Sequence, residues 1–299
     1  MKSITIFTPT YNRAYTLPKL YESLCRQSCN DFIWLIVDDG STDETKALID
    51  NWIAESKIAI KYFYQENGGK MRAHNKGVKE CETPLFACVD SDDYLTDNAI
   101  EEILLFWNQN FKGEDNIAGM ITNRLMVDSK NRTPRRVSEF PNLRSCRIMD
   151  LSRKYGNQPE TVIVFISEIL KQYPFPEIKG EKFITEAVVS DQLDQKYNVL
   201  LCSKSIVICE YLPDGYTRNI SNYFKSAPKG WALYYNQQIL FYSHENTFKQ
   251  RIKAIVYYII MSKKAKERNI YSKCNDKSFH YLIARLIAPY YSWKHKSLF

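Results

Sequence analysis

The sequence lacks several features that mark common classes of protein. It has no run of about 18 apolar residues, the length that crosses a bilayer as a helix, so we expect no membrane-spanning helix. It shows no N-terminal secretory signal, because a strand-like stretch, residues 4–7, begins almost at once. Internal repeats and low-complexity linkers are missing as well. With 299 residues the chain is expected to bury a substantial core, as one large domain or as one domain with an appendage.

The eight cysteines contain neither a C-x-x-C pair nor a zinc-ligand spacing. Several of them, such as Cys88 and Cys202, lie in apolar stretches, where a free thiol acts as a small hydrophobic side chain. Without a secretory signal we expect reduced thiols in a cytosol. The glycosylation sequons at Asn131 and Asn219 are then accidental.

The positive charge is concentrated at the end of the chain. Residues 249–299 hold 12 Lys or Arg against two acids, a net +10, which leaves −3 on the rest of a chain whose total is +7. Basic residues there flank apolar and aromatic helical stretches, residues 254–261 and 281–293. This pattern fits a helix lying on an anionic membrane, so we expect a cytoplasmic protein held peripherally at the inner face of the cell membrane. A helical cap that forms a homodimer is the alternative, and no nucleic-acid-binding motif accompanies the charge.

The first hundred residues alternate between strand-like and helix-like stretches. Expected strands are residues 4–8, 32–37, 58–64 and 85–89. Expected helices carry Leu17, Leu20 and Leu24; then Ala47, Leu48 and Trp52, after a cap at Ser41 or Thr42; then residues 70–79. This alternation predicts right-handed βαβ units and a mostly parallel sheet.

After residue 115 the alternation is looser. Residues 118–127 and 161–166 are expected as strands, 184–197 as a helix, and 199–202 with 206–211 as a late strand pair. From about Tyr223 the chain is expected to be helical.

Three carboxylates stand together in Asp90-Ser91-Asp92-Asp93, directly after an expected strand. Carboxylates repel one another and are not buried together without a counter-cation. Open α/β sheets bind ligands at the carboxyl ends of their strands, and oxygen ligands there suit Mg²⁺ or Mn²⁺, which usually arrive with phosphates. The first hypothesis is therefore a metal-assisted site for a phosphorylated substrate. An acidic turn that only caps a helix beginning near Thr96 is the alternative; an EF-hand loop is excluded, because Leu95 stands where its turn needs Gly.

Polar segments follow the other expected strands too. They are Thr8-Pro9-Thr10-Tyr11-Asn12, Val37-Asp38-Asp39-Gly40-Ser41-Thr42-Asp43, and Asn67-Gly68-Gly69 through Asn75-Lys76-Gly77. In order and spacing, these segments and the acidic cluster resemble the family 2 glycosyltransferases of the GT-A fold, over about the first third of the chain. The resemblance implies an α/β fold with a mostly parallel central sheet flanked by helices, and here with a C-terminal helical appendage. We expect a catalytic domain over residues 1–222, with a nucleotide-binding half (1–115) and an acceptor half (116–222), and a helical extension over 223–299.

The resemblance implies an inverting hexosyltransferase that moves a sugar from a UDP-sugar to a glycan or lipid-linked oligosaccharide, in capsule, exopolysaccharide or lipopolysaccharide synthesis. Its cofactor would be Mn²⁺ or Mg²⁺, held by Asp92 with Asp90 and Asp93 close by, bridging the donor phosphates. The family contact to the base maps to Asp39, whose carboxylate can accept the uracil N–H; a helix cap with Ser41 is the alternative.

Further donor contacts are implied by the same motifs. Pro9 and Tyr11 would line the base pocket, and Arg13 would reach phosphate. The matching positions add Thr8, Asn67, Asn75 and Ser91. Many members have Arg before the Asn that matches Asn75; His74 stands there in this chain, so a phosphate contact is assigned to Lys70.

Inverting transfer also needs a general base for the acceptor hydroxyl. The family takes it from an acidic residue that opens a helix, which makes Glu186 the first candidate, Asp191 the second and Glu181 a weaker third. The family's acidic pair is not intact, because Ala187 follows Glu186, and Ser190 replaces a frequent Trp. The alternative is that Glu186 only interacts favourably with the dipole of its helix.

The segment Glu210-Tyr211-Leu212-Pro213-Asp214-Gly215-Tyr216-Thr217-Arg218-Asn219 resembles the closing loop of polysaccharide-assembly members, so Arg218 is a candidate phosphate contact and a surface turn the alternative. Two other functions stay open. A sugar nucleotidyltransferase would need a Gly-rich loop after the first strand, and residues 8–13 contain no Gly. A non-catalytic nucleotide-sugar-binding membrane scaffold would have kept the pocket but lost the base.

Overall fold

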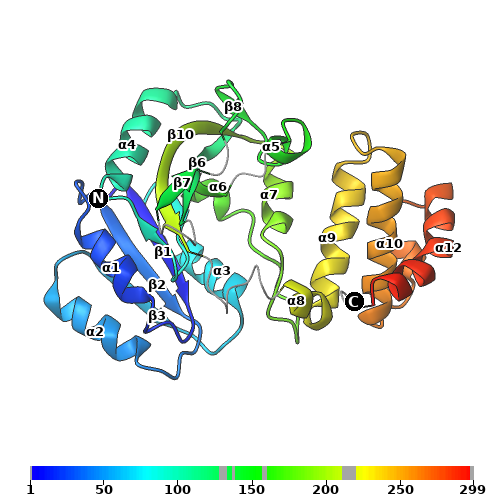
Figure 1. Ribbon diagram of the computed structural model, residues 1–299, viewed down its shortest axis with the longest axis horizontal. Helices are drawn as coiled ribbons and strands as arrows, with labels where there is room; N and C mark the ends of the chain where they lie inside the picture. Colours follow the sequence, from blue (N-terminus) through cyan, green and yellow to red (C-terminus); the bar gives the residue numbers. More distant parts are fainter. Residues whose placement is uncertain (1, 128–132, 137–138, 157–159, 211–219, 297–299) are drawn as a thin grey trace. The chain divides into compact units, whose positions relative to one another are not determined.

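The computed structural model forms a sheet unit and a helical unit (Figure 1). The sheet unit comprises Met1–Pro174 and Lys196–Leu212, and the helical unit comprises Phe175–Gln195 and Pro213–Phe299. The structure describes residues 2–127, 133–136, 139–156, 160–210 and 220–296. The division therefore differs from the expected boundary after residue 222. The stretch 175–195, expected in the acceptor half of the catalytic domain, packs with the helices instead.

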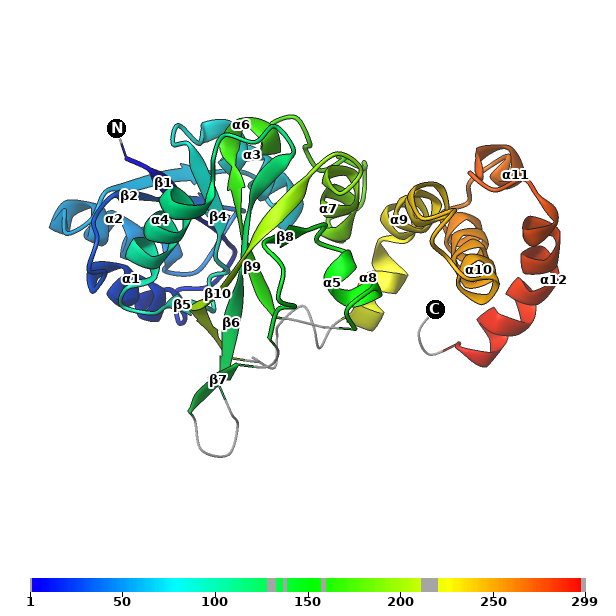
Figure 2. The ribbon, with the colours of Figure 1, turned by 90° about the horizontal axis from the view of Figure 1, so that it is seen from above.

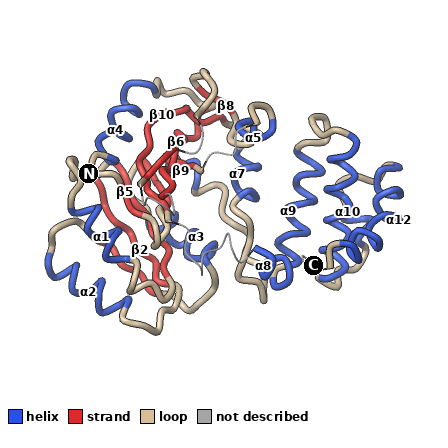
Figure 3. The backbone as a smooth tube through the Cα atoms, viewed as in Figure 1, coloured by secondary structure: helices blue, strands red, loops and turns tan. Residues whose placement is uncertain are grey.

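The N-terminal half of the sheet has the parallel arrangement that the sequence predicts. Its strands lie in the order β3-β2-β1-β4, and every neighbouring pair is parallel. Figure 3 colours the strands of the sheet red and the helices blue. These strands are β1 (Ile4–Thr10), β2 (Phe32–Asp38), β3 (Ile60–Tyr64) and β4 (Leu85–Cys88). Parallel register places their carboxyl ends, and the polar segments that follow them, along one edge of the sheet.

Helices cover both faces of this half-sheet. The helices are α1 (Leu17–Cys25), α2 (Thr45–Glu55), α3 (Lys70–Glu80) and α4 (Ala99–Asn110). Alternate residues of β1, Ile4 and Ile6, belong to the core that α1, α2 and α4 share. On the other face Phe7 contacts Gly77 of α3 so closely that a Cβ at Gly77 would lie 2.3 Å from the ring. Glycine at this position lets α3 approach the sheet.

The start of α2 differs from the expectation. Neither Ser41 nor Thr42 caps the helix, which begins at Thr45, and the Thr45 backbone N–H donates to Asp43 Oδ1 (3.1 Å). Ala47 is exposed, while the neighbouring Ile49 is fully buried. Of the predicted apolar face, Leu48 and Trp52 pack in the core, while Ile49 takes the place expected for Ala47.

The second half makes the sheet mixed. Strand β9 is antiparallel to β4 and to β6, β10 is parallel to β6, and β5 pairs antiparallel with β10 at the edge. The bounds are β5 (Tyr94–Leu95), β6 (Ile117–Val127), β7 (Pro134–Arg136), β8 (Ser145–Cys146), β9 (Thr161–Ile166) and β10 (Asn198–Cys209), with short helices α5 (Asp150–Arg153) and α6 (Ser167–Leu170).

The expected late strand pair is wrong. Residues 198–209 form one strand, β10, which continues through the polar residues Ser203, Lys204 and Ser205. The register against β6 shifts on both sides of Ser205, so bulges absorb the polar stretch without ending the strand.

The helical unit is built on one central helix. Figure 2 shows α10 between α9 and α12. The helices are α7 (Ala187–Leu193), α8 (Ile220–Ser226), α9 (Pro228–Phe241), α10 (Phe248–Lys264), α11 (Ile270–Lys273) and α12 (Phe279–Lys294). The helix expected over 184–197 is thus shorter. None of these described helices is long and apolar enough to cross a membrane.

Candidate active site

The loops after β1 and β2 hold one another. The Asn12 backbone N–H donates to Ser41 Oγ (2.9 Å), and Asn12 Oδ1 accepts from the Thr42 backbone N–H (2.8 Å). Asn12 has a φ of 52°, in the left-handed region that Asn adopts more readily than most residues. The Asp39 N–H donates to the Thr10 carbonyl oxygen (2.8 Å). These bonds make the ends of two neighbouring strands one fixed edge.

Asp38, at the end of β2, stabilises this edge through buried hydrogen bonds. Its side chain is fully buried; Oδ1 accepts from the Ser41 backbone N–H (2.8 Å), and Oδ2 accepts from the Tyr62 hydroxyl (2.9 Å). Burial, and then the Asp38 carboxylate, raise the pKa of Tyr62, so the phenol remains a donor. Asp38 is therefore a structural residue.

Asp39, the predicted base contact, holds the loop that precedes α3. Its Oδ1 accepts from Gln65 Nε2 (2.7 Å) and from the Gly68 N–H (2.8 Å), and its Oδ2 accepts from the Gly69 N–H (2.7 Å). An ionised carboxylate has about four acceptor positions, so three donors leave room for about one more. The base contact of Asp39 stays a prediction; the loop contact was not foreseen.

Gly40 lets the two loops meet. Its φ is +87°, and a Cβ there would lie 2.8 Å from the backbone nitrogen of Asn67. A side chain would push apart the segments that Asp39 ties together.

The acidic cluster follows β4 and contacts cations on both sides. Lys70 Nζ, at the first residue of α3, lies 2.7 Å from Asp90 Oδ1, and Arg124 Nη1 on β6 lies 3.3 Å from Asp93 Oδ2. The Cys209 thiol also forms a hydrogen bond with Asp93. The start of α3, strand β6 and the end of β10 therefore supply partners for the cluster.

The three carboxyl groups have different proton affinities. Burial opposes ionisation of Asp90, but the charges of Lys70 and then Arg124 outweigh it, so the pKa of Asp90 is lowered. Burial, and then the negative charge of Asp90, raise the pKa of Asp92. Burial raises the pKa of Asp93 to about 7, against the opposing charge of Arg124. Anionic charge at Asp92 and Asp93 is thus incompletely neutralised by the protein.

The acidic cluster does not cap the helix that follows it. In α4 the Ile100 N–H donates to Gln27 Oε1 (3.1 Å), and the Ala99 N–H donates to the Thr96 carbonyl oxygen (3.1 Å). Strand β5 also separates the cluster from α4. The alternative of a simple capping turn is therefore wrong.

Other residues predicted for donor binding lie along the same edge. Tyr11 is 48% exposed, and Arg13 lies over the ring of Tyr15, 5.6 Å from its centroid. The charge of Arg13 also favours ionised Asp92. Thr8 and Pro9 are buried, and Thr8 Oγ1 accepts from the indole N–H of a core tryptophan (3.0 Å). Thr8 therefore supports the strand from inside.

The residues on and beside α3 complete this edge. Ser91 is buried in the acidic turn, and Asn67 and Asn75 are half-buried, before and within α3. His74 packs edge-on against two phenylalanine rings, at 5.6 and 5.5 Å between ring centroids. Its charge would favour ionised Asp90, so His74 lies beside the acidic cluster. The binding roles of these residues stay predictions.

The candidate bases belong to the helical unit. Glu186 is exposed at the start of α7. Asp191 is fully buried, and its carboxylate accepts hydrogen bonds from Gln238 Nε2 and from the Tyr242 hydroxyl (3.0 Å). Glu181 accepts from the backbone N–H groups at the start of α9. Asp191 and Glu181 thus have structural contacts. Arg218, the predicted loop contact, lies outside the described residues.

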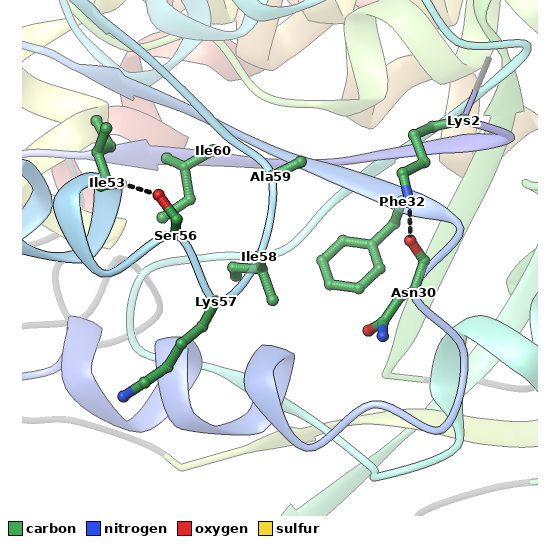
Figure 4. A pocket seen from close by; sticks show the side chains of 9 residues that line it. All are labelled: Lys2, Asn30, Phe32, Ile53, Ser56, Lys57, Ile58, Ala59 and Ile60. Carbon is green, nitrogen blue, oxygen red and sulfur yellow. Dashed lines mark hydrogen bonds between the residues drawn. The ribbon is translucent and has the colours of Figure 1, made fainter.

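A cavity of about 520 Å³ lies elsewhere in the sheet unit (Figure 4). Phe32 and Ile60, at the amino ends of β2 and β3, line it together with Lys2 and Lys57. It is therefore at the edge opposite the acidic cluster and contains none of the predicted site residues.

Comparison with known proteins decides the family. Residues 5–171, more than half of the chain, match the model described as glycosyl transferase family 2. The chain belongs to glycosyltransferase family 2. The resemblance inferred from the four strand-end segments is confirmed.

Related proteins and solved structures resemble a larger part of the family 2 chain. An uncharacterized glycosyltransferase of Haemophilus influenzae is 27% identical over 261 residues, which are 87% of this chain and 95% of that relative. The teichoic acid poly(glycerol phosphate) polymerase of Staphylococcus epidermidis is 34% identical over 122 residues, 40% of this chain but 16% of that relative. The crystal structure of Staphylococcus aureus TarS 1–349 with UDP-GlcNAc has a TM-score of 0.59 at 16% identity, covering 98% of this chain and 92% of that one. This likeness confirms the expected GT-A fold.

The contacts of Asp93 and Asp39 in this family 2 glycosyltransferase were not foreseen. Asp93 has the partners Arg124 and Cys209, and Asp39 accepts from Gln65 and from the N–H groups of Gly68 and Gly69. A charged residue inside the strand-like run 118–127 was the one signal in the sequence for Arg124, since a buried cation requires a partner.

Proposed function

We propose that this glycosyltransferase moves a sugar from a UDP-sugar to a hydroxyl group of a cell-surface glycan or of a lipid-linked oligosaccharide, with inversion at the anomeric carbon. The observation that carries the proposal is the acidic turn after β4. Burial and the charge of Asp90 raise the pKa of Asp92 there, and the cations Lys70 and Arg13 lie beside the turn. The UDP-GlcNAc complex of TarS supports a uridine donor, and the teichoic acid relative supports a cell-wall polymer as the product.

The donor diphosphate accounts for the cations at the strand ends. Lys70 and Arg13 flank the acidic turn, and both favour negative charge there. Asp39 would accept the uracil N–H with its remaining acceptor position while it keeps the loop before α3 closed. Tyr11, half-exposed after β1, would stack on the base.

A divalent cation fits the acidic turn. Among the described residues no three His, Cys, Asp or Glu side chains are arranged as a ready metal cluster. Mg²⁺ and similar ions, however, are commonly held by one or two carboxylates together with substrate phosphates. Asp92, with Asp90 and Asp93 as neighbours, would hold the ion, because positive charge there offsets the burial and the repulsion from Asp90 that raise its pKa. A bound ion would stabilise the negative charge of the leaving nucleotide.

The general base would be Glu186. Transfer requires that the acceptor hydroxyl lose its proton as its oxygen bonds to the anomeric carbon and the bond to the diphosphate breaks. Glu186 is exposed at the first turn of α7, whereas Asp191 is buried among hydrogen-bond donors of α9 and of the residue that follows it. This contrast favours Glu186 for the proton transfer.

The test is nucleotide release from a panel of UDP- and GDP-sugars, with Mn²⁺ and with EDTA. We expect release from UDP-sugars with metal, and a loss of at least about a hundredfold in Asp92→Asn. The control is Asp97→Asn, the same change at an exposed aspartate outside the turn, which should keep the wild-type rate. A thermal shift with metal and uridine nucleotides gives an independent reading. Wild-type turnover in Asp92→Asn, or release from GDP-sugars alone, would refute the metal or uridine assignment.

A further inference from the structure

Helix α12 presents a continuous apolar stripe to solvent. The stripe consists of Phe279, Leu282, Leu286, Tyr290 and Trp293, all of them exposed. Their spacing of three and four residues places them on one side of an α-helix. Leu286 is 82% exposed and Trp293 is 72% exposed. Scattered apolar residues on a surface need no explanation, but a contiguous patch of this kind indicates an interaction site.

The orientation of the stripe is fixed by packing within the helical unit. Tyr281, Ala284 and Ala288, on the opposite side of α12, are buried in the core that α12 shares with α10. The Tyr281 ring also contacts Tyr271 edge-on, at 4.8 Å between centroids. The small alanine side chains allow close helix contact, so α12 cannot rotate its stripe inward without burying bulkier groups.

The start of α12 is anchored as well. Arg251 Nε on α10 lies 2.5 Å from Asp276 Oδ2, and Asp276 Oδ1 accepts from the Ser278 N–H (2.8 Å). Burial alone would raise the pKa of Asp276, but the hydrogen bonds from Ser278 and the Arg251 ion pair outweigh it and lower the pKa. The helix that carries the stripe is therefore held firmly in the helical unit.

The charges beside the stripe are all of one sign. Residues 277–296 contain four Lys or Arg and no Asp or Glu. At 100° per residue, Arg285 and Lys294 fall on opposite sides of the stripe, and both are exposed. Long basic side chains beside an aromatic stripe can reach phosphate groups while the stripe enters the apolar layer.

We propose that α12 docks this protein on an anionic lipid bilayer, with Phe279, Leu286 and Trp293 inserted at the interface and Arg285 and Lys294 on the headgroups. The proposal does not depend on the sugar transferred. It also assigns the membrane contact expected of residues 249–299 to one helix. The apolar run 254–261 of α10, expected to face lipid, is mostly buried in the helical core.

A second copy of the chain fits this surface less well. A helix of this length offers a strip about 24 Å long and about 10 Å wide, roughly 250 Å². A stable dimer buries about 800 Å² on each partner. A two-fold contact along the stripe would also bring the basic flanks of the two copies together, since the same patch meets itself. Anionic lipid complements the charge that a second copy would repel.

The test is sedimentation of the full chain with vesicles of phosphatidylcholine alone or of equal parts phosphatidylcholine and phosphatidylglycerol. We expect binding to the anionic vesicles that weakens as salt is raised. Leu286→Ser should weaken binding about tenfold and Arg285→Gln about fivefold. The matched controls are Leu240→Ser, at a leucine 50% exposed on α9, and Lys112→Gln, which removes one charge from the sheet unit; both should bind as wild type.

Two further readings make the outcome decisive. Because Leu286 is exposed, Leu286→Ser should unfold at the wild-type temperature and release nucleotide from a soluble donor at the wild-type rate, which separates lipid docking from sugar transfer. Absence of vesicle binding, or equal binding by Leu286→Ser and wild type, overturns the proposal. A dimer that Leu286→Ser dissociates, without vesicle binding, assigns the stripe to self-association and overturns it too.

Discussion

Substitution of Glu181 by Gln tests how the segment before α7 is held. Glu181 is 8% exposed; its Oε1 accepts from the Lys229 N–H and its Oε2 from the Gly230 N–H, each at 2.8 Å. These groups open α9, where a carboxylate also favours the helix dipole. Hydrogen bonds to a charged group contribute about 1.5–3 kcal/mol each. Gln keeps one acceptor oxygen but turns its amide N–H₂ toward the other donor, so we expect Glu181→Gln to lower the free energy of unfolding by about 2–3 kcal/mol.

The assay is hydrogen exchange at the first turn of α9, combined with urea denaturation followed by circular dichroism. If Glu181 holds this turn, the Lys229 and Gly230 amides in Glu181→Gln should exchange roughly thirtyfold faster, the factor that about 2 kcal/mol represents. Protection equal to wild type would mean that the cap contributes nothing and that α9 is held by its apolar contacts alone.

Glu186→Gln is the matched variant, since it makes the same change in the same segment. Glu186 is exposed, so unfolding should change by less than about 0.5 kcal/mol. Loss of a general base should lower sugar transfer by about 10²–10⁴-fold. Glu181→Gln, by contrast, should keep its activity per folded molecule. The opposite pattern, with stable but inactive Glu181→Gln and active Glu186→Gln, would refute the assignment of the base.

Three further changes follow from contacts in the two units. The pKa of Asp276 is lowered in the folded state, so its stabilising contribution is present above about pH 4 and is lost as the pH falls through the folded pKa. Asp276→Asn should therefore lower the free energy of unfolding by about 2 kcal/mol at pH 7. In thermal melts at low pH the variant and wild type should not differ. Gly77→Ala should lower the free energy of unfolding by about 1–3 kcal/mol, because its Cβ would overlap the Phe7 ring. The urea midpoint should fall accordingly, and an unchanged midpoint would contradict this packing. Asp39→Asn should raise the donor KM about tenfold with kcat nearly unchanged, because an amide has one oxygen for the donors that the carboxylate holds; an equal fall in kcat would contradict a binding role.

The N-terminal half of the fold was predictable because its signals are local. Each strand from β1 to β4 is a short apolar run, and a polar segment follows it directly in the sequence. Parallel pairing then brings those segments to one edge, so the grouping of Asp39, Lys70 and Asp92 followed from order alone. The family match over residues 5–171 covers this half.

The remaining features depend on contacts between residues far apart in the chain. Nothing near Glu181 indicates that it binds the start of α9, 48 residues later. The ion pair of Arg124 with Asp93 likewise joins β6 to the acidic turn, 31 residues earlier in the chain. Local periodicity also cannot show that bulges carry β10 through Lys204, because a polar stretch has the same composition in a turn and in a bulge.

The discontinuous helical unit has a consequence for synthesis on the ribosome. Residues 175–195 emerge before β10, but Val188 and Asp191 bond to side chains of α9 and of the residue that follows it, which are made later. The sheet unit can complete β10 while this earlier segment still lacks its partners. A nascent chain that ends at residue 212 would therefore leave Val188, Val189 and the Asp191 carboxylate without the contacts that bury them. Such a chain is a substrate for chaperones and an aggregation hazard, and a truncation at residue 212 would inherit the same defect.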